Sequence, residues 1–298
     1  MILSNNARPI PTLSVERNYS DASKWPVLRW LGPWRASIGL GALEGGNVAL
    51  PNVKFLEARF TFKPKKWLEI GLSRTAQFCG KGRVCNVKAF TNTLLGRDNG
   101  STAVSNPGNQ MAGYDLRLRS PWKKIPAAVF IQLIGEDEAN HLPSKFLGLL
   151  GGEVWGNSRF GSWRLRGEYA DSACEFSRRN PEFGCAYRNT AFPQGYTFRG
   201  RIIGHSMDND GRMYSLGATL VRPKGDSWNV TLRKVDLNRD GGFDSTHTVS
   251  KVASELKNVE VQYNRALAKG QLQLGVGLDD IKGDGTHARG FVGWRVNL

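Results

Sequence analysis

The sequence predicts an all-β protein whose antiparallel strands form a transmembrane β-barrel of the outer-membrane type. Three observations predict this fold class. Apolar and polar residues alternate for about ten residues at a time. The connections between these segments are alternately short and long, and Trp67, Trp122 and Trp228 each lie beside a short one. A half-solvated β-sandwich also has alternating strands, but it gives no reason for such a regular alternation of connection lengths.

The composition indicates a folded chain. Of the 298 residues, 40% are hydrophobic, which excludes an intrinsically disordered protein. The longest apolar run, at 127–134, is much shorter than a membrane-spanning helix requires, so a helical membrane protein is excluded. Lys and Arg number 41 against 26 Asp and Glu, which gives a net charge of +15. This charge favours an acidic partner, such as nucleic acid, anionic lipid headgroups or an acidic polysaccharide.

About 12–13 strands are expected in this chain. Twelve follow in order from Trp34, at 34–42, 53–63, 67–75, 110–119, 127–134, 146–155, 161–170, 212–221, 228–236, 256–265, 271–279 and 289–298. A further alternating segment from Thr12 to Asn18 makes the count odd, whereas bacterial barrels normally have even counts. The chain also starts without a secretory signal. We therefore expect that the N-terminal part of a longer parent is absent. Residues 1–33 would be an N-terminal segment with the end of a preceding strand and a periplasmic turn, and 34–298 the barrel domain.

The connections divide into two classes. Short turns are expected near 64–66, 121–126, 156–161, 223–227 and 268–270, and long connections at about 43–52, 76–109, 135–145, 171–211, 237–255 and 280–288. The alternating segment 196–203 is assigned to the 171–211 connection, because a strand there would break the alternation. The acidic residues at 135–138 are expected to end a strand, and 236–242 is interpreted as a polar loop without a role.

The last strand, at 289–298, places Trp294, Val296 and Leu298 on one face. This ending resembles the C-terminal strand of outer-membrane proteins, which normally finishes in Phe. Basic residues gather in the short turns, where they suit a membrane surface with anionic headgroups: Lys63, Lys65, Lys66, Lys123, Lys124, Arg222, Lys224 and Lys269.

The four cysteines form two close pairs, Cys79 with Cys85 and Cys174 with Cys185. This spacing predicts two local disulfides in an oxidising compartment. Four unrelated reduced thiols are the alternative. A zinc site is disfavoured, because neither pair has the CxxC spacing and none of the four histidines is close to either pair.

Six segments stand out as motifs: 67–75, 113–117, 132–138, 142–146, 168–171 and 204–210. Together they resemble the capsule assembly protein family Wzi, and the resemblance extends from Arg8 to the C-terminus. It implies an outer-membrane barrel of about 18 strands in the full-length family, with a helical portion on the periplasmic side. It also implies a lectin that helps to hold capsular polysaccharide on the cell surface.

We therefore expect a protein of the bacterial outer membrane that binds capsular polysaccharide and is not an enzyme. No cofactor or metal is expected. The expected partners are an acidic capsular polysaccharide and outer-membrane lipid with lipopolysaccharide, without nucleic acid, and the chain is expected to be a monomer. Arginine forks would bind the carboxylates of acidic sugars, and aromatic rings would stack on sugar rings. The candidate binding residues are Glu136, Asp137, Tyr196, Arg199, Arg201, His205, Asp208 and Asn209.

Three other interpretations are weaker. A porin-like channel for acidic oligosaccharides would use the arginines expected in the lumen, although these could instead pair with lumen carboxylates. A hydrolase based on His205 lacks a nucleophile elbow. A calcium loop starting at Asp208 has Met213 and Thr219 where Gly and Glu are required.

The residues expected to face the lumen are mostly charged. They are Arg35, Glu69, Asp115, Arg117, Arg119, Arg164, Arg166, Glu168, Arg233, Glu260, Gln262, Gln273 and Arg295.

Overall fold

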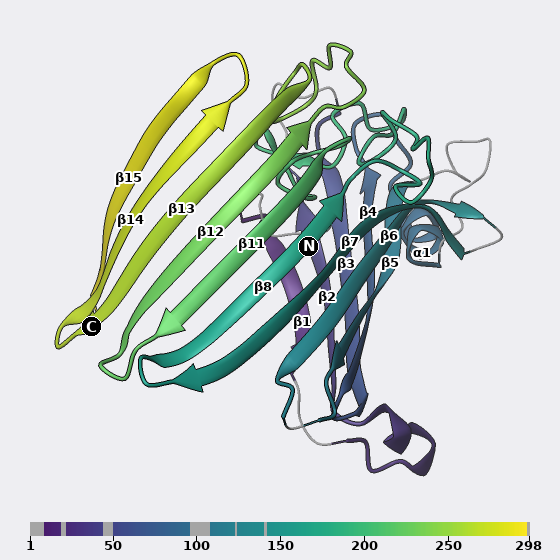
Figure 1. Cartoon of the computed structure of the whole chain (residues 1–298). Coiled ribbons are helices and arrows are strands. Elements are labelled where there is room, and N and C mark those ends of the chain that lie inside the picture. The colour runs from purple at the N-terminus through teal and green to yellow at the C-terminus, as the bar shows by residue number, and fades with distance from the viewer. Residues whose placement is uncertain are drawn as a thin grey trace.

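The computed structural model describes residues 9–18, 22–43, 50–95, 108–122, 124–139 and 142–296. Thirteen strands form one strongly curved antiparallel sheet, in which every strand pairs with its neighbours in chain order (Figure 1). They are β1 (Thr12–Arg17), β2 (Trp34–Ala42), β3 (Val53–Lys65), β4 (Leu68–Cys79), β5 (Gly108–Arg119), β6 (Ala127–Ala139), β7 (Leu142–Ser158), β8 (Gly161–Asp171), β11 (Arg212–Val221), β12 (Asp226–Leu237), β13 (Ser254–Leu267), β14 (Gly270–Ile281) and β15 (Gly285–Val296).

The thirteen alternating segments predicted from the sequence are all strands of this sheet. The segment assigned to the 171–211 connection also lies outside the sheet, as predicted. It forms a separate two-stranded hairpin of β9 (Thr197–Phe198) and β10 (Arg201–Ile202). Strand β1 pairs with β2 and β15 with β14, and within the described residues no pairing joins β1 to β15. The division into an N-terminal segment and a barrel domain stays a prediction.

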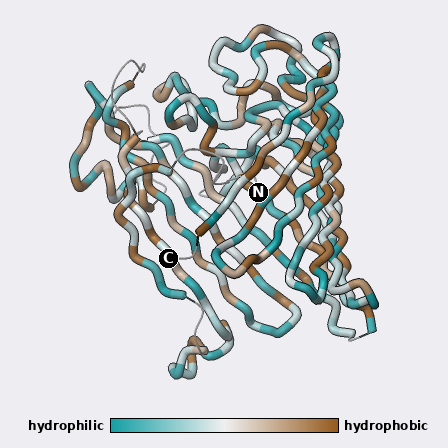
Figure 2. Tube along the Cα trace, turned by 90° about the vertical axis from the view of Figure 1, so that its left-hand side faces the viewer, coloured by the Kyte–Doolittle hydropathy of each residue, from teal (hydrophilic) through white to brown (hydrophobic). Residues whose placement is uncertain are grey.

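Hydrophobic and hydrophilic residues alternate along the strands, as the changing colours of the tube in Figure 2 show, and successive side chains of a strand point to opposite faces of the sheet. Strand pairing places Leu216, Leu232 and Val259 side by side across three strands, and all three are exposed. Leu165 and Leu274 are also exposed, by 49% and 38%. No second layer covers these side chains in the part of the chain that the structure describes. The sheet is therefore not one half of a dry sandwich, and its outward face is the face that a bilayer would solvate.

The inward face holds charged residues that largely pair with one another. Glu153, which is only 4% exposed, lies between the guanidinium groups of Arg117 and Arg164. The Glu260 carboxylate forms an ion pair with the Arg289 guanidinium, with 3.0 Å between the oxygen and nitrogen atoms. The possibility that lumen arginines pair with lumen carboxylates is thus confirmed. Such pairing satisfies charges that a partly dry interior would otherwise leave uncompensated.

Two connections that were expected to be long are short. Strands β6 and β7 continue as a hairpin through the expected 135–145 connection, where Asp137 pairs with Ser144. The acidic residues at 135–138 therefore do not end the strand. The 280–288 connection is a tight turn between Ile281 and Gly285, where Gly283 has a φ of 89° and Gly285 a φ of 95°. Glycine makes such a turn possible because it adopts positive φ without steric cost.

A helix that the sequence did not predict follows β4 within the 76–109 connection. Helix α1 (Val87–Leu95) starts after Asn86, whose side-chain oxygen accepts a hydrogen bond from the Ala89 amide at 2.8 Å. Its Phe90 and Leu94 pack against the sheet at Leu56, Ala76, Phe78 and Cys79. The helix lies beside the ends of β4 and β5 (Figure 1). The other helix is η1 (Pro26–Leu31), between β1 and β2.

The core lies where the 172–211 connection packs against the inward faces of the strands. Tyr196 is fully buried there, its ring centroid 6.0 Å from that of Phe55, and its hydroxyl donates to the Asn109 carbonyl at 3.0 Å. Both predicted disulfides, Cys79–Cys85 and Cys174–Cys185, are formed. No helix within the described residues has the length and apolar character needed to cross a bilayer.

Candidate functional site

A cleft of about 480 Å³ opens between the β6–β7 hairpin and the 172–211 connection. It lies at the end of the sheet that carries the long connections, which we call the loop end. Most of its walls are polar. The lining residues are Asn109, Glu136, Asp137, Lys145, Glu182, Gly184, Cys185, Arg188, Asn189, Thr190 and Pro193.

Charges of both signs meet in this cleft. The Lys145 ammonium lies 3.5 Å from an Asp137 carboxylate oxygen and 3.2 Å from one of Glu182. Burial raises the pKa of the Glu136 carboxyl well above its usual range, although the Tyr187 backbone amide and the Arg188 charge oppose the rise. Carboxylates and side-chain amides accept hydrogen bonds from sugar hydroxyls, and cations attract carboxylate substituents. The cleft therefore has groups that could bind the hydroxyls and the charged substituents of a saccharide.

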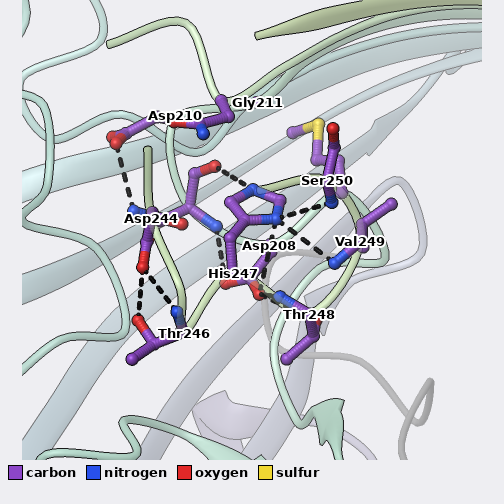
Figure 3. A network of polar contacts seen from close by, with 12 residues as sticks. Asp208, Asp210, Gly211, Asp244, Thr246, His247, Thr248, Val249 and Ser250 are labelled. Atoms are coloured by element: carbon purple, nitrogen blue, oxygen red, sulfur yellow. Dashed lines mark hydrogen bonds and ion pairs between the residues drawn. The ribbon is translucent and has the colours of Figure 1, made fainter. Parts of the chain in front are cut away.

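The connection behind the cleft is held by Asp208, which is completely buried (Figure 3). One of its carboxylate oxygens accepts hydrogen bonds from the amide and the hydroxyl of Thr248, both at 2.7 Å. The other accepts a hydrogen bond from the Asn209 amide at 2.8 Å. Thr248 belongs to the β12–β13 connection at 238–253, so Asp208 joins two long connections.

Arg188 strengthens this junction from the cleft side. Its guanidinium donates to the Asn209 side-chain oxygen at 3.1 Å and to Asp244 at 2.8 Å, and it lies 3.8 Å from Asp208. The nearby His247 ring is buried, and its Nδ1 accepts the backbone amides of Val249 and Ser250 (Figure 3). Arg188 thus lines the cleft and also fixes the connections that form its floor.

The turn at 208–211 explains why the sequence has Asp-Asn-Asp-Gly at this point. Asp208 and Asp210 have φ values of 63° and 54°. Asp is one of the few side chains that tolerate the left-handed region, because its short polar group bonds locally. The motif is therefore a structural turn, and its carboxylates are used to connect segments of the chain.

Burial shifts the pKa of two titratable groups behind the cleft. Desolvation lowers the pKa of His205 to about 3, so the ring is neutral and its Nδ1 accepts the Met207 amide. Desolvation and the Asp240 charge raise the pKa of Asp210 to about 6, although the Gly184 amide and two arginines oppose the rise. These groups lie in the buried support of the connection and do not meet a nucleophile there.

The predicted site residues fall into two groups. Glu136 and Asp137 line the cleft, and Arg199 and Arg201 are exposed on the β9–β10 hairpin. The other four are 4% exposed or less: Tyr196, His205, Asp208 and Asn209. Their part in polysaccharide binding stays a prediction, and with this burial it would be to position the connection.

Sequence reasoning missed the cations of the cleft, Lys145 and Arg188. Lys145 lies two residues after Pro143 in a segment expected to be a loop, and Arg188 lies three residues after Cys185. Proximity to a predicted disulfide could have drawn attention to Arg188. The interpretation of 236–242 as a polar loop without a role was wrong. Arg239 pairs with the buried Asp171 carboxylate and donates to the Asp210 carbonyl at 2.9 Å.

Metal chemistry finds no support in the geometry. Across the described ranges no group of three His, Cys, Asp or Glu side chains could hold a metal ion. The His205 ring and the Asp208 carboxylate are both occupied by main-chain or threonine donors.

Comparison with known proteins places this architecture among capsule proteins. The family model of the capsule assembly protein Wzi matches residues 1–288. An uncharacterized 55.8 kDa protein in the cps region of Klebsiella pneumoniae is 31% identical over 242 residues, which are 80% of this chain and 46% of that protein. This chain thus spans about half the length of that relative.

The structure of Escherichia coli Wzi is also similar. That protein is described as an outer membrane protein involved in group 1 capsule assembly and as a carbohydrate binding beta-barrel. The TM-score is 0.81 at 26% identity, and the match covers 95% of this chain and 59% of the other. The predicted fold class, an antiparallel sheet of the outer-membrane barrel type, is confirmed by this match.

Proposed function

Because this chain belongs to the capsule assembly protein Wzi family, we propose that it is a bacterial outer-membrane protein that binds capsular polysaccharide and assists capsule assembly at the cell surface. The similarity to a carbohydrate-binding barrel of capsule assembly supports this proposal. The apolar outward face of the sheet supports a membrane location.

The cleft at the loop end is the observation that carries the binding proposal. Outer-membrane barrels have their longer connections on the cell-surface side, so the loop end would face the capsule. The cleft offers Lys145 and Arg188 to acidic groups and Asp137, Glu182 and Asn189 to hydroxyls. The net positive charge of the chain, +15, favours an acidic polymer over a neutral one.

Exposed residues elsewhere in the 172–211 connection would extend the contact with the polymer. Arg199 and Arg201 stand on the surface of the β9–β10 hairpin, and a guanidinium can bind a sugar carboxylate through two parallel hydrogen bonds. Tyr196, His205, Asp208 and Asn209 would support this surface from below. In this account Asp137, Arg199 and Arg201 touch polysaccharide, and the four buried residues hold their backbone in place.

We also propose that the protein binds without chemistry. Among the described residues that line it, the cleft has carboxylates but no nucleophile held by an oriented base, which covalent catalysis requires. A transport channel is the second candidate, because the inward face is lined with arginines. The 172–211 connection packs on that inward face through Tyr196 and its neighbours, which favours a plugged barrel. A steady open conductance in planar bilayers would favour the channel instead.

Binding of purified acidic capsular polysaccharide to the detergent-solubilised protein tests the proposal. We expect Lys145→Ala, and Arg199→Ala combined with Arg201→Ala, each to weaken binding by about tenfold, since charged hydrogen bonds contribute roughly 1.5–3 kcal/mol. Lys224→Ala, in a short turn at the opposite end of the sheet, is the matched control and should bind like the parent. Capsule retention on cells should likewise fall in both loop-end variants and stay unchanged in Lys224→Ala.

Unchanged binding in all the loop-end variants would mean that neither the cleft nor the β9–β10 hairpin binds the polysaccharide. Heat-modifiable mobility on gels, a sign of a folded barrel, has to be preserved in each variant for this comparison.

A further inference from the structure

Strands β2 to β5 differ from the rest of the sheet in how charge is distributed between their two faces. Their carboxylates are Glu57, Glu69 and Asp115, and all three lie on the inward face. Glu57 is two residues from Phe55 and lies opposite Thr75 in the strand pairing, and both of these neighbours contact Tyr196 of the inner connection. Asp115, for example, pairs with Arg59. The outward face of these four strands therefore carries no carboxylate.

The outward face of β2–β5 is apolar until it reaches the loop end. At that end the outward positions are held by Lys54, Arg74 and Gln110. In the strand pairing Lys54 lies opposite Phe78, Arg74 opposite Ala112 and Gln110 opposite Ala76. Gln110 is 8% exposed, and neither polar atom of its amide group has a hydrogen-bond partner in the described structure. A band of polar and cationic groups thus lies above an apolar surface, at the depth where the headgroups of a surrounding leaflet would be.

A groove of about 480 Å³ crosses the apolar part of this face. Its lining includes the small residues Ala36, Ala58 and Ala112, the larger Phe60, Leu72 and Tyr114, and Leu142 and Pro143 of the β6–β7 hairpin. Arg74 lines the groove at the loop end. The mostly apolar lining suits a hydrocarbon chain, and Arg74 lies where the polar head of such a chain would start.

Helix α1 makes the loop end of this groove more cationic. It packs on the outward face of β3 and β4, and its Thr93 carbonyl accepts a hydrogen bond from the Arg74 guanidinium at 3.1 Å. The helix contributes Lys88 and leaves Val87 and Leu95 exposed, by 79% and 62%. It has no acidic residue. A helix with lysine and exposed apolar residues suits the interface between headgroups and acyl chains.

We propose that this groove binds a phosphorylated, acylated glycolipid of the outer leaflet, the lipid anchor of lipopolysaccharide. One acyl chain would lie over Ala58, between Phe60 and Tyr114, and a phosphate would lie near Arg74 and Lys54. An acyl chain gains little by leaving other lipid for an apolar groove, so attraction between the phosphate and the cationic side chains of Lys54, Arg74 and Lys88 provides the selectivity. The proposal rests on the membrane location proposed above but not on the polysaccharide cleft.

Co-purification of lipid A with the full chain tests this site. The protein is extracted from outer membranes in mild detergent, and the lipid A retained after washing is measured by mass spectrometry. We expect Lys54→Glu with Lys88→Glu to retain at least about fivefold less lipid A, since each basic group near an anionic lipid surface is worth about that factor. Ala58→Trp, which fills the groove without changing charge, should have a similar effect.

Matched controls place the same changes elsewhere on the sheet. Lys224→Glu reverses a charge at the opposite end, and Leu274→Trp enlarges an outward residue on β14; both should retain lipid A like the parent. Arg74 is not varied, because its hydrogen bond fixes α1. The parent should also exchange its lipid A for added phosphorylated lipid A, and much less for the dephosphorylated form.

The inference would be overturned if the folded variants retained as much lipid A as the parent. It would equally be overturned if dephosphorylated lipid A or a neutral phospholipid exchanged as well as phosphorylated lipid A. Flotation of the parent with membranes separates this failure from a failure of the membrane location. Protein that does not float refutes both, whereas protein that floats without lipid A refutes only the groove.

Discussion

At the scale of single residues, Asp208 is the group on which two long connections depend. It is fully buried and accepts hydrogen bonds from Thr248 and Asn209. Buried carboxylates of this kind are stable only while their donors stay in place, and an unsatisfied partner costs about 1–3 kcal/mol. The 238–253 connection is thus fastened to the 172–211 connection by a few short polar contacts.

Asp208→Asn tests this junction. The amide keeps the left-handed backbone but replaces one acceptor oxygen by a donor, so we expect the connections to lose about 1–3 kcal/mol of local stability. Hydrogen exchange of the amides at 246–250 should become faster, while exchange in β12 stays unchanged. Equal exchange in both proteins would show that Asp208 does not hold the two connections together.

The pKa of Asp210 predicts a pH dependence of the same region. Burial raises this pKa to about 6 from an ordinary value of 3.8, so the folded state holds the proton more tightly than the unfolded state. The resulting stabilisation is complete below pH 3.8 and is lost as the pH rises through about 6. Asp210→Asn, which cannot ionise, should remove this loss.

Exchange protection of the 172–211 amides, corrected for the intrinsic pH dependence of exchange, measures the effect. Asp210→Asn should increase protection at pH 8 by up to about 2–3 kcal/mol relative to the parent, and by much less at pH 4. Asp284→Asn, at an exposed position in the β14–β15 turn, should change neither. An equal gain at both pH values would contradict the assigned ionisation.

Long-range polar contacts at this scale could not be predicted from the sequence. Arg188 and Asp244 are 56 residues apart, and Arg239 and Asp171 are 68 apart. Their pairing depends on how two irregular connections pack against each other. A local pattern of polar and apolar residues does not indicate such packing. Glu136 and Asp137, which line the cleft, could be singled out from the sequence because an acidic run is visible in the sequence itself.

At the scale of elements, the alternation within each strand decides which face meets lipid. Leu232 of β12 is exposed on the outward face, and Thr231, its neighbour, lies on the inward face opposite Glu260. We expect Leu232→Arg to destabilise the protein in a bilayer by about 2–4 kcal/mol, as a charge near the midplane does. Thr231→Arg should cost far less, because an arginine there meets a carboxylate.

The free energy of unfolding from lipid vesicles, measured by denaturant titration, compares these two variants. A similar cost for both substitutions would mean that the faces of β12 do not differ in their surroundings.

The strands could be predicted because a period of two over ten or more residues is a strong local pattern. Helix α1 could not, because it is short and rich in threonine and its stability comes from packing on Phe78 and Leu56. The continuation of the β6–β7 hairpin through residues 135–145 could not be predicted from the sequence either, because its acidic residues are typical of a loop. Asp137 pairs with Ser144 because β7 provides a neighbouring strand, and the composition of the segment does not indicate this.

At the scale of the whole molecule, the curved sheet, the packed inner connection and the cleft form one arrangement. The outward face is apolar, the inward face is paired and charged, and the loop end carries the polar groups that suit an acidic saccharide. Binding of polysaccharide and of a lipid anchor would then take place on opposite faces of the same loop end.

Spin labels placed one at a time at residues 228–236 of β12, in protein reconstituted into bilayers, test the membrane-facing surface most directly. Accessibility to oxygen, which concentrates in lipid, should peak at Trp228, Val230 and Leu232. Accessibility to a water-soluble nickel reagent should peak at Asn229, Thr231 and Arg233. Oxygen and nickel profiles without a period of two, or with both reagents excluded at Val230 and Leu232, would contradict the account.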